Sequence, residues 1–199
     1  MRAARDTQFA LAATLVGVLL AGCANAGGMH GSGATAMMDM QDAAERADEM
    51  LDATIQAVVP EIEWAHHVTT AGSCQVNRRR TVTTVISDQR RGSFLGVVER
   101  SWQRRGYAIT SVNQSRDMPA IFAKSRDGFQ LQLSFGYKGQ AFFEVATPCV
   151  TKSDVTEPTS VPNGPAYPLG EIPTPNVRSA FWSAEVPVGG TGRGEGDGR

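Results

Sequence analysis

The sequence predicts an α+β fold, with two helices packed on one face of a mainly antiparallel sheet of about five to six strands. Two stretches, 37–59 and 93–105, repeat apolar residues every three or four positions, as amphipathic helices do. Several shorter stretches are rich in β-branched residues or alternate apolar with polar ones, as strands do. The links between the last strands are short, which favours an antiparallel meander.

The two helices are expected to bury one face each against the sheet. The first begins at Met37 and ends before Pro60, because proline interrupts a helix. The second spans 93–105, with Ser93 as its N-cap and Gly106 just after its C-terminus. The apolar stripes consist of Met37, Met40, Ala44, Ala47, Leu51, Ile55 and Val58 in the first helix, and of Phe94, Leu95, Val98 and Trp102 in the second.

Six strands are expected, at 62–68, 81–86, 107–112, 120–124, 129–137 and 141–147. The clearest is 129–137, where Phe129, Leu131, Leu133, Phe135 and Tyr137 alternate with polar or small residues. Such alternation is typical of a strand with one face on the core and one toward water. We therefore expect Gln130, Gln132 and Ser134 to lie on an exposed face of the sheet.

Two arginine clusters, 78–80 and 90–91, fall in loops or at strand ends in this assignment. They could meet as a basic patch, but separately solvated charges are the favoured interpretation, because isolated surface charges are common. The formal net charge of the chain is −1. No global basic field therefore argues for binding to nucleic acid or to anionic lipid.

The N-terminus has the pattern of a lipoprotein signal peptide over residues 1–22. Arg2 and Arg5 precede a twelve-residue apolar run, 9–20, which is shorter than a membrane span. The run leads into a lipobox, the cleavage and lipidation signal, formed by Leu20, Ala21, Gly22 and Cys23. Cys23 is the expected lipidation site, and its lipid is the expected contact with a membrane. A short transmembrane anchor and an ordinary cleaved signal are the alternatives.

Four segments are therefore expected: the signal peptide 1–22, a lipidated flexible tether 23–36, a globular domain 37–150 and a disordered tail 151–199. The tail contains seven prolines and eight glycines among its 49 residues, a composition typical of disorder. Phe181 and Trp182 are its only bulky pair. They could dock on the domain or on a partner, or be a stray pair that contacts neither.

Cys74 and Cys149 are expected to form a disulfide, because an exported chain meets oxidising conditions and these two thiols remain once Cys23 carries lipid. Two free buried thiols are the alternative. Neither cysteine has a second Cys or His at metal-ligand spacing, which disfavours a metal site.

No catalytic or cofactor-binding motif is present in the sequence. His66 and His67 point to opposite sides of a strand, and Glu63 with His67 would supply only two metal ligands. We therefore expect no metal, no cofactor and a non-enzymatic role in binding or support, with an envelope protein or the cell wall as the possible partner. A hydrolase whose site is built from scattered residues is the alternative.

The order of these features resembles the LppA-type lipoproteins of mycobacteria and related actinobacteria. The resemblance rests on the lipobox, on the helix ending at Val59-Pro60, on Cys74, on the segment 128–135 and on Thr147-Pro148-Cys149. It implies a cell-envelope lipoprotein on the outer face of the cytoplasmic membrane. The family supplies no catalytic residues to compare.

Overall fold

The computed structural model describes residues 37–168 and 170–185, which form the α+β fold that the sequence predicts. The helices are α1 (Met40–Gln56), α2 (Asp88–Arg104) and the short 3₁₀ helix η1 (Tyr137–Gly139). The strands are β1 (Trp64–His66), β2 (Thr70–Ala71), β3 (Val76–Val82), β4 (Ala108–Asn113), β5 (Ala120–Lys124), β6 (Gln130–Phe135) and β7 (Ala141–Ala146).

The signal peptide 1–22, the lipobox with Cys23 and the tether 23–36 lie outside the described residues, so these remain predictions. Within the described part of the chain, no helix combines the length and the apolar character needed to cross a membrane.

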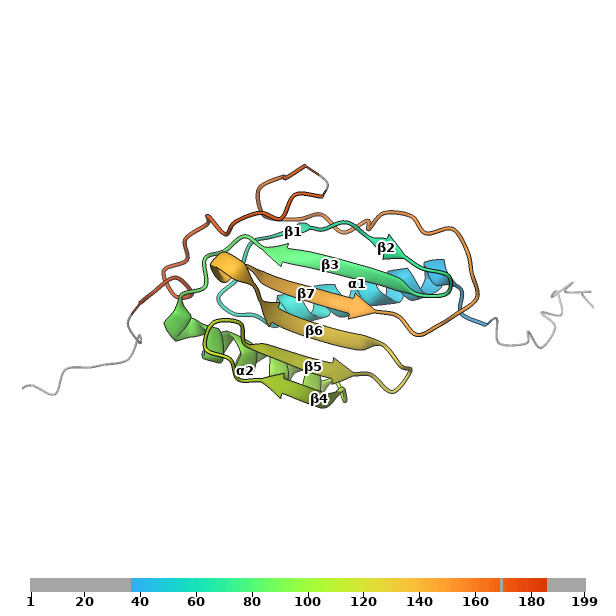
Figure 1. Cartoon of the computed structure of the whole chain (residues 1–199), viewed down its shortest axis with the longest axis horizontal. Helices are drawn as coiled ribbons and strands as arrows, with labels where there is room; N and C mark the ends of the chain where they lie inside the picture. Colours follow the sequence, from blue (N-terminus) through green and yellow to red (C-terminus); the bar gives the residue numbers. More distant parts are fainter. Residues whose placement is uncertain (1–36, 169, 186–199) are drawn as a thin grey trace, which may run out of the picture. The chain divides into compact units, whose positions relative to one another are not determined.

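The seven strands form one antiparallel sheet in the order β1-β3-β7-β6-β5-β4, with β2 pairing beside β1 along the same edge of β3. The sheet is thus six strands across, in agreement with the expected five to six. Helix α1 packs on β3 and β7, and α2 packs on β4 and β5. Both helices lie behind the sheet in Figure 1, so one face is covered by helices and the other faces the viewer.

Helix α1 begins at Met40 rather than at Met37 because a capping box fixes its first turn. The side chain of Asp39 accepts a hydrogen bond from the backbone N–H of Asp42, and the side chain of Asp42 accepts one from the N–H of Asp39. This reciprocal pairing satisfies two of the free donors at the helix start. Met37 lies before the cap and is exposed.

Helix α2 begins at Asp88, five residues before the predicted N-cap at Ser93, which lies exposed inside the helix. Ser87 occupies the N-cap position, and its N–H donates to the carbonyl of Trp182 at 2.9 Å. Its hydroxyl donates to the carbonyl of Ala184. The C-terminal segment therefore fixes the start of α2. The prediction for Gly106 is confirmed, since it follows the helix with a φ of 78°.

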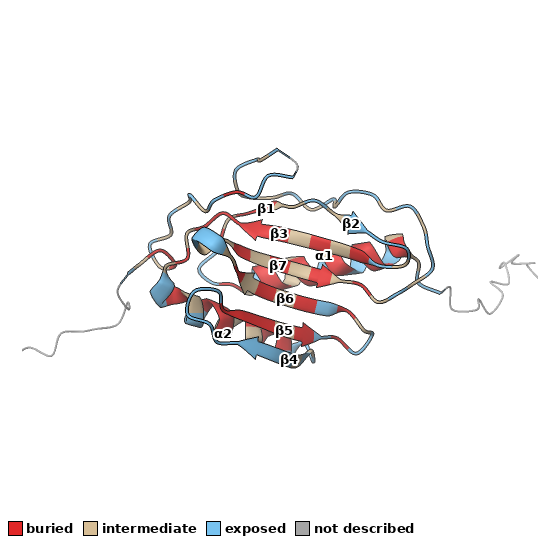
Figure 2. Cartoon of the chain, in the orientation of Figure 1, coloured by how far each residue is buried: buried red, intermediate tan, exposed pale blue. Residues whose placement is uncertain are grey.

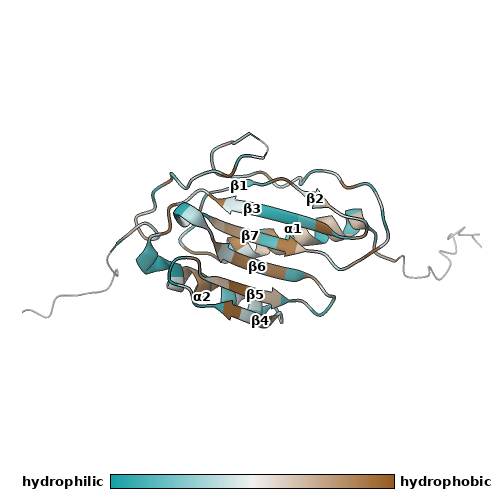
Figure 3. Cartoon of the chain, viewed as in Figure 1, coloured by the Kyte–Doolittle hydropathy of each residue, from teal (hydrophilic) through white to brown (hydrophobic). Residues whose placement is uncertain are grey.

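The strand predicted at 81–86 is wrong in its position, because β3 runs from Val76 to Val82 and includes the first arginine cluster. Figure 3 colours β3 as hydrophilic, yet Figure 2 shows much of it buried. Arg78 and Arg80 point to the helix side, where carboxylates of α1 pair with them. Those partners lie about 30 residues earlier in the chain, so the local pattern around β3 does not reveal them.

The last three strands confirm the predicted meander. Strand β5 matches the expected bounds, and β6 and β7 lie within theirs. Leu131, Leu133 and Phe135 are buried on the helix side, as their alternation predicts.

The expectation of a disordered tail from residue 151 onward is wrong for 151–168 and 170–185, which pack on the domain, while 186–199 lie outside the described residues. The segment runs along the β1 and β2 edge of the sheet in Figure 1. The N–H of Met40 donates to the carbonyl of Thr151, and that of Trp64 donates to the side chain of Asn163. Backbone and side-chain hydrogen bonds therefore order this segment despite its composition.

The described part of the tail reaches the hydrophobic core through Trp182. The ring of Trp182 is fully buried and lies edge-on to Phe94 of α2, with ring centroids 5.2 Å apart. Its indole N–H donates to the carbonyl of Pro60 at 2.6 Å. For Phe181 and Trp182, docking on the domain was one of the outcomes left open, and it is confirmed for Trp182. The domain therefore extends beyond its predicted end at residue 150.

The predicted disulfide is confirmed: Cys74 and Cys149 are bonded, with their Cα atoms 4.8 Å apart. Cys74 lies in the turn between β2 and β3, and Cys149 follows β7. The N–H of Val150 donates to the carbonyl of Cys74, so backbone pairing continues beside the bridge.

Candidate functional site

The sheet face opposite the helices is the candidate functional surface, here called the open face. Strand pairing places Ser111, Phe122, Gln132, Glu144 and Arg79 in one row across β4, β5, β6, β7 and β3. Residues paired across antiparallel strands share a face, so these five side chains all lie on the open face. We call them the central row.

A second row runs parallel to the central row, two residues away along β3, β5, β6 and β7 and three residues away along β4, where the pairing shifts between Ile109 and Ser111. It contains Ala108, Lys124, Gln130, Ala146 and Asn77. The prediction that Gln130, Gln132 and Ser134 lie on the open face is confirmed, with Gln130 exposed and the other two half-buried.

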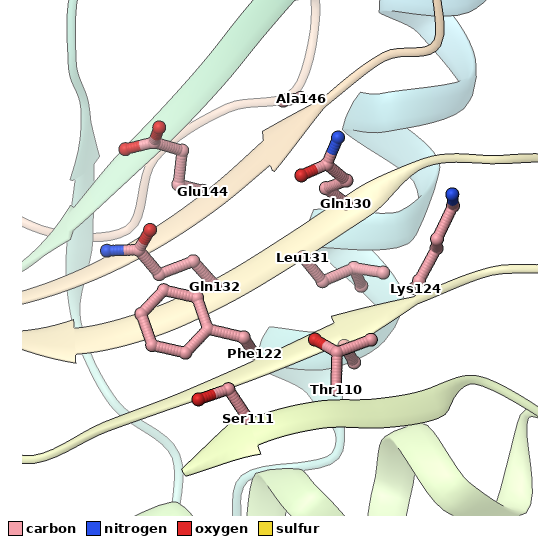
Figure 4. Close-up of a pocket in the computed structure, with 10 residues that line it drawn as sticks. Thr110, Ser111, Phe122, Lys124, Gln130, Leu131, Gln132, Glu144 and Ala146 are labelled. Carbon is pink, nitrogen blue, oxygen red and sulfur yellow. The ribbon is translucent and has the colours of Figure 1, made fainter. Parts of the chain in front are cut away.

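A shallow groove of about 650 Å³ lies between the two rows (Figure 4). Phe122, Gln132 and Glu144 line one side, and Lys124, Gln130 and Ala146 line the other. The hollow forms where Ala146 stands among longer side chains. The volume lies within the roughly 300–1,000 Å³ typical of small-molecule sites.

Glu144 is the only carboxylate in the central row, and two side chains of the neighbouring strand β3 hold it in place. The Nε of Arg79 donates to one carboxylate oxygen at 2.6 Å, and the side-chain amide of Asn77 donates to the other. The guanidinium of Arg79 also lies over the ring of Phe142. This charge-assisted contact offsets the negative charge of Glu144 and fixes its orientation.

The groove offers both hydrogen-bond donors and hydrogen-bond acceptors. Gln132 donates from its amide to the hydroxyl of Ser134 at 2.9 Å, which orients its carbonyl oxygen. Lys124 contributes one exposed amine at the edge of the groove, and Phe122 contributes a half-buried ring (Figure 4). The arrangement suits recognition of a polar ligand through an apolar ring and several neutral polar groups.

Neither His66 nor His67 lines the groove. The Nε2 of His66 lies 2.8 Å from the carbonyl oxygen of Ser160, and its ring contacts Trp64 edge-on. Burial, followed by the charge of Arg79, lowers the pKa of His67 below its usual value. Protonation of His67 is thus disfavoured near neutral pH. No group of three or more His, Cys, Asp or Glu side chains within 37–168 and 170–185 is arranged to hold a metal.

The two arginine clusters do not form a basic patch, because all five side chains are buried or paired within the fold. Arg78 and Arg80, 1% and 0% exposed, face α1. Arg79 pairs with Glu144, and Arg91 pairs with Asp88. Arg90 is buried, with its guanidinium 4.4 Å from the centroid of Phe181. The interpretation as separately solvated charges is also wrong.

The buried arginines join α1, β3 and the tail. Arg78 pairs with Asp48 at 3.2 Å and donates to the carbonyl of Thr156 at 2.6 Å. Arg80 pairs with Asp52 at 2.5 Å and donates to the hydroxyl of Ser160 at 3.0 Å. Buried charges are tolerated when they are paired and hydrogen-bonded in this way. The cluster therefore has a structural role, holding the tail against the domain.

Burial affects the ionisation of this cluster more strongly than pairing does. It raises the pKa of the Asp48 carboxyl above its usual value, although the charges of Arg78 and Arg80 act in the opposite direction. It also lowers the pKa of Arg80, against the hydrogen bond and charge of Asp52.

Several residues of the candidate site, among them Phe122, Glu144 and Lys124, were not singled out from the sequence. Phe122 alternates with the buried Ile121 and Ala123, so its outward direction was readable once β5 was assigned. Glu144 is the single charge in the apolar strand β7, which is a comparable signal. Arg79 was named only as a member of the cluster 78–80, and its place on the open face was missed because its strand was assigned to a loop.

Comparison with family models, with curated proteins and with solved structures finds no match to this chain.

Proposed function

We propose that the chain is a cell-envelope lipoprotein held on the outer face of the cytoplasmic membrane by lipid on Cys23, and that its domain is a non-enzymatic binding module. The open face is its binding surface, and the groove beside the central row is the observation that carries the proposal. Similarity to the LppA-type lipoproteins is part of the same proposal.

The lipobox supports the anchoring half of the proposal. Leu20, Ala21 and Gly22 precede Cys23 at the end of an apolar run that is too short to span a bilayer. A diacylglyceryl group carries two acyl chains, and two chains give stable anchoring where a single chain gives only marginal binding.

The arrangement of the domain supports the binding half. Helices cover one face of the sheet, and the tail packs along one edge. The open face keeps a preformed groove of polar side chains around one aromatic ring. The ring of His66 lies edge-on to Trp64, and its Nε2 is hydrogen-bonded to the backbone carbonyl of Ser160. These contacts favour the binding module over the hydrolase alternative.

Replacing Cys23 with serine is expected to move the protein from the membrane fraction to the soluble fraction, or to leave an uncleaved precursor. Serine has no thiol to carry the diacylglyceryl group, and the signal cleavage at the lipobox depends on that modification. Fractionation with and without detergent, together with the mass of the N-terminal peptide, measures both results. Correctly processed Cys23→Ser protein that still needs detergent for release would contradict the anchor.

Occupancy of the open face is tested by labelling one introduced cysteine in intact cells. We expect Gln132→Cys to be protected from a membrane-impermeant maleimide in cells and to react fully in the purified protein. Gln103→Cys, on the exposed side of α2, is the matched control and should react equally in both settings. Equal labelling at both positions in cells would refute a bound partner on this face. If Gln103→Cys is not labelled in intact cells, the location on the outer face of the cytoplasmic membrane is refuted.

A further inference from the structure

We propose that the groove on the open face binds an uncharged saccharide chain, with the ring of Phe122 packed against one sugar ring. The inference rests on the proposed role of the open face as a binding surface and names the chemical class of its ligand.

The hydrogen-bonding groups of the groove suit a ligand that both donates and accepts. The side-chain amides of Gln130 and Gln132 each carry donors and an acceptor, and Ser111 adds a hydroxyl. Among the described residues, none donates to the side-chain carbonyl of Gln132, whose amide is held by Ser134. A sugar hydroxyl also donates and accepts, whereas a phosphate accepts only and an ammonium donates only. Mixed amide and hydroxyl lining therefore matches a polyhydroxylated ligand.

The charge of the groove argues against an ionic ligand. Lys124 stands at one end, and Glu144 stands across the groove with Arg79 bonded to it. An anion would face the Glu144 carboxylate, and a cation would face the charges of Lys124 and Arg79. Nucleic acid would need several phosphate-binding cations, and the groove lining supplies one lysine.

Phe122 supplies the apolar part of the site. Its ring lies on the open face between Ser111 and Gln132, its partners in the neighbouring strands, instead of in the core (Figure 4). A sugar ring has an apolar C–H face that an aromatic ring can cover while the hydroxyls at its rim meet polar side chains. The central row provides both parts, since Gln132 stands directly beside the Phe122 ring.

The position of the groove on the sheet favours a saccharide over an extended peptide. Peptides that bind to sheets usually pair their backbone with a free edge. Eight of the ten residues that line the groove belong instead to β5, β6 and β7, whose backbone groups are already paired on both sides, and the other two, Thr110 and Ser111, belong to the edge strand β4. A ligand there must be recognised by side chains alone.

The test is calorimetric titration of the full-length lipidated protein in detergent with the uncharged, fully N-acetylated tetrasaccharide tetra-N-acetylchitotetraose, here called chitotetraose. We expect binding to the wild type, and a loss of at least tenfold in affinity for Phe122→Ala and for Gln132→Ala. Phe122→Tyr keeps an aromatic ring at this position and is expected to stay within about threefold of the wild type. Tyr137→Ala is the matched aromatic control, because Tyr137 is 78% exposed and lies outside the groove lining.

Melting curves of each variant separate lost binding from lost folding, and Phe122 and Gln132 are only half-buried, so their replacement should leave the fold intact. No titration signal at millimolar chitotetraose, or equal binding by Phe122→Ala, would overturn the inference. Binding of inorganic phosphate in its place would also overturn it. If Gln132→Cys is nevertheless protected in cells, the binding module stands and only the saccharide assignment falls.

Discussion

Replacing Trp182 with alanine is expected to lower the free energy of unfolding by about 3–5 kcal/mol, the usual cost of removing a fully buried tryptophan. The indole is 0% exposed and packs edge-on against Phe94 and Phe181. Its loss opens a cavity in the core and leaves the carbonyl of Pro60 without its donor. For a domain of this size the melting temperature should fall by roughly 10 °C.

Two substitutions serve as controls for Trp182→Ala. Trp182→Phe keeps an aromatic ring but loses the hydrogen bond to Pro60, so a smaller loss of about 1–2 kcal/mol is expected. Val161→Ala changes a tail residue that is 86% exposed, and its effect should stay within about 0.5 kcal/mol. Chemical denaturation monitored by circular dichroism measures all three. A loss below about 1 kcal/mol for Trp182→Ala would show that the tail does not close the core.

Truncation after Lys152 extends this test to the whole tail. It removes Trp182 and also deprives Arg78 and Arg80 of their acceptors at Thr156 and Ser160. We expect a larger loss than for Trp182→Ala, whereas composition alone predicts a small one. A chain truncated after Glu185 keeps every one of these contacts and should melt close to the full-length protein.

Local periodicity predicted the strands whose partners are close in the chain. Strands β5, β6 and β7 follow one another through short links, and the alternation of Leu131 and Leu133 with Gln130 and Gln132 defines both faces. The open face, with Gln130 and Gln132 of the candidate site on it, therefore follows from sequence. The groove itself does not, because it depends on how rows from four strands align.

Elements that depend on distant partners were predicted less well. In the sequence, Arg78 and Arg80 indicate a loop or a strand end. They are buried in a strand because the carboxylates of Asp48 and Asp52 in α1 pair with them. The start of α2 is fixed by hydrogen bonds from Ser87 to Trp182 and Ala184, nearly 100 residues later. The residues close to Ser87 in the sequence therefore do not predict where α2 begins.

The tail shows the limit of composition as a guide to disorder. A segment rich in proline and glycine has few apolar side chains with which to offset the entropy of ordering. Here a few anchors suffice: Trp182 fills the core, and Asn163 bonds to the backbone around β1. Proline also restricts the unfolded chain, which lowers the entropy lost on ordering. Phe181 and Trp182 were the visible signal of this docking.

Removing the disulfide with the double change Cys74→Ser and Cys149→Ser is expected to lower the free energy of unfolding by about 4.5 kcal/mol in the chain-entropy account. The bridge joins residues 75 positions apart, so its loss frees a long loop in the unfolded state. The folded state should change little, because Val76 and Val150 keep their backbone hydrogen bonds to Thr147 and Cys74.

Reduction of the wild type is the matching experiment for the double variant. Cys149 is exposed, so a reductant reaches the bridge in the folded protein. The reduced wild type and the double variant should then unfold at the same denaturant concentration, well below the oxidised wild type. Cys23→Ser controls for the removal of a cysteine that carries no bridge and should keep the oxidised stability. An unchanged midpoint after complete reduction would mean that β3, β7 and the tail hold the loop closed without the bridge.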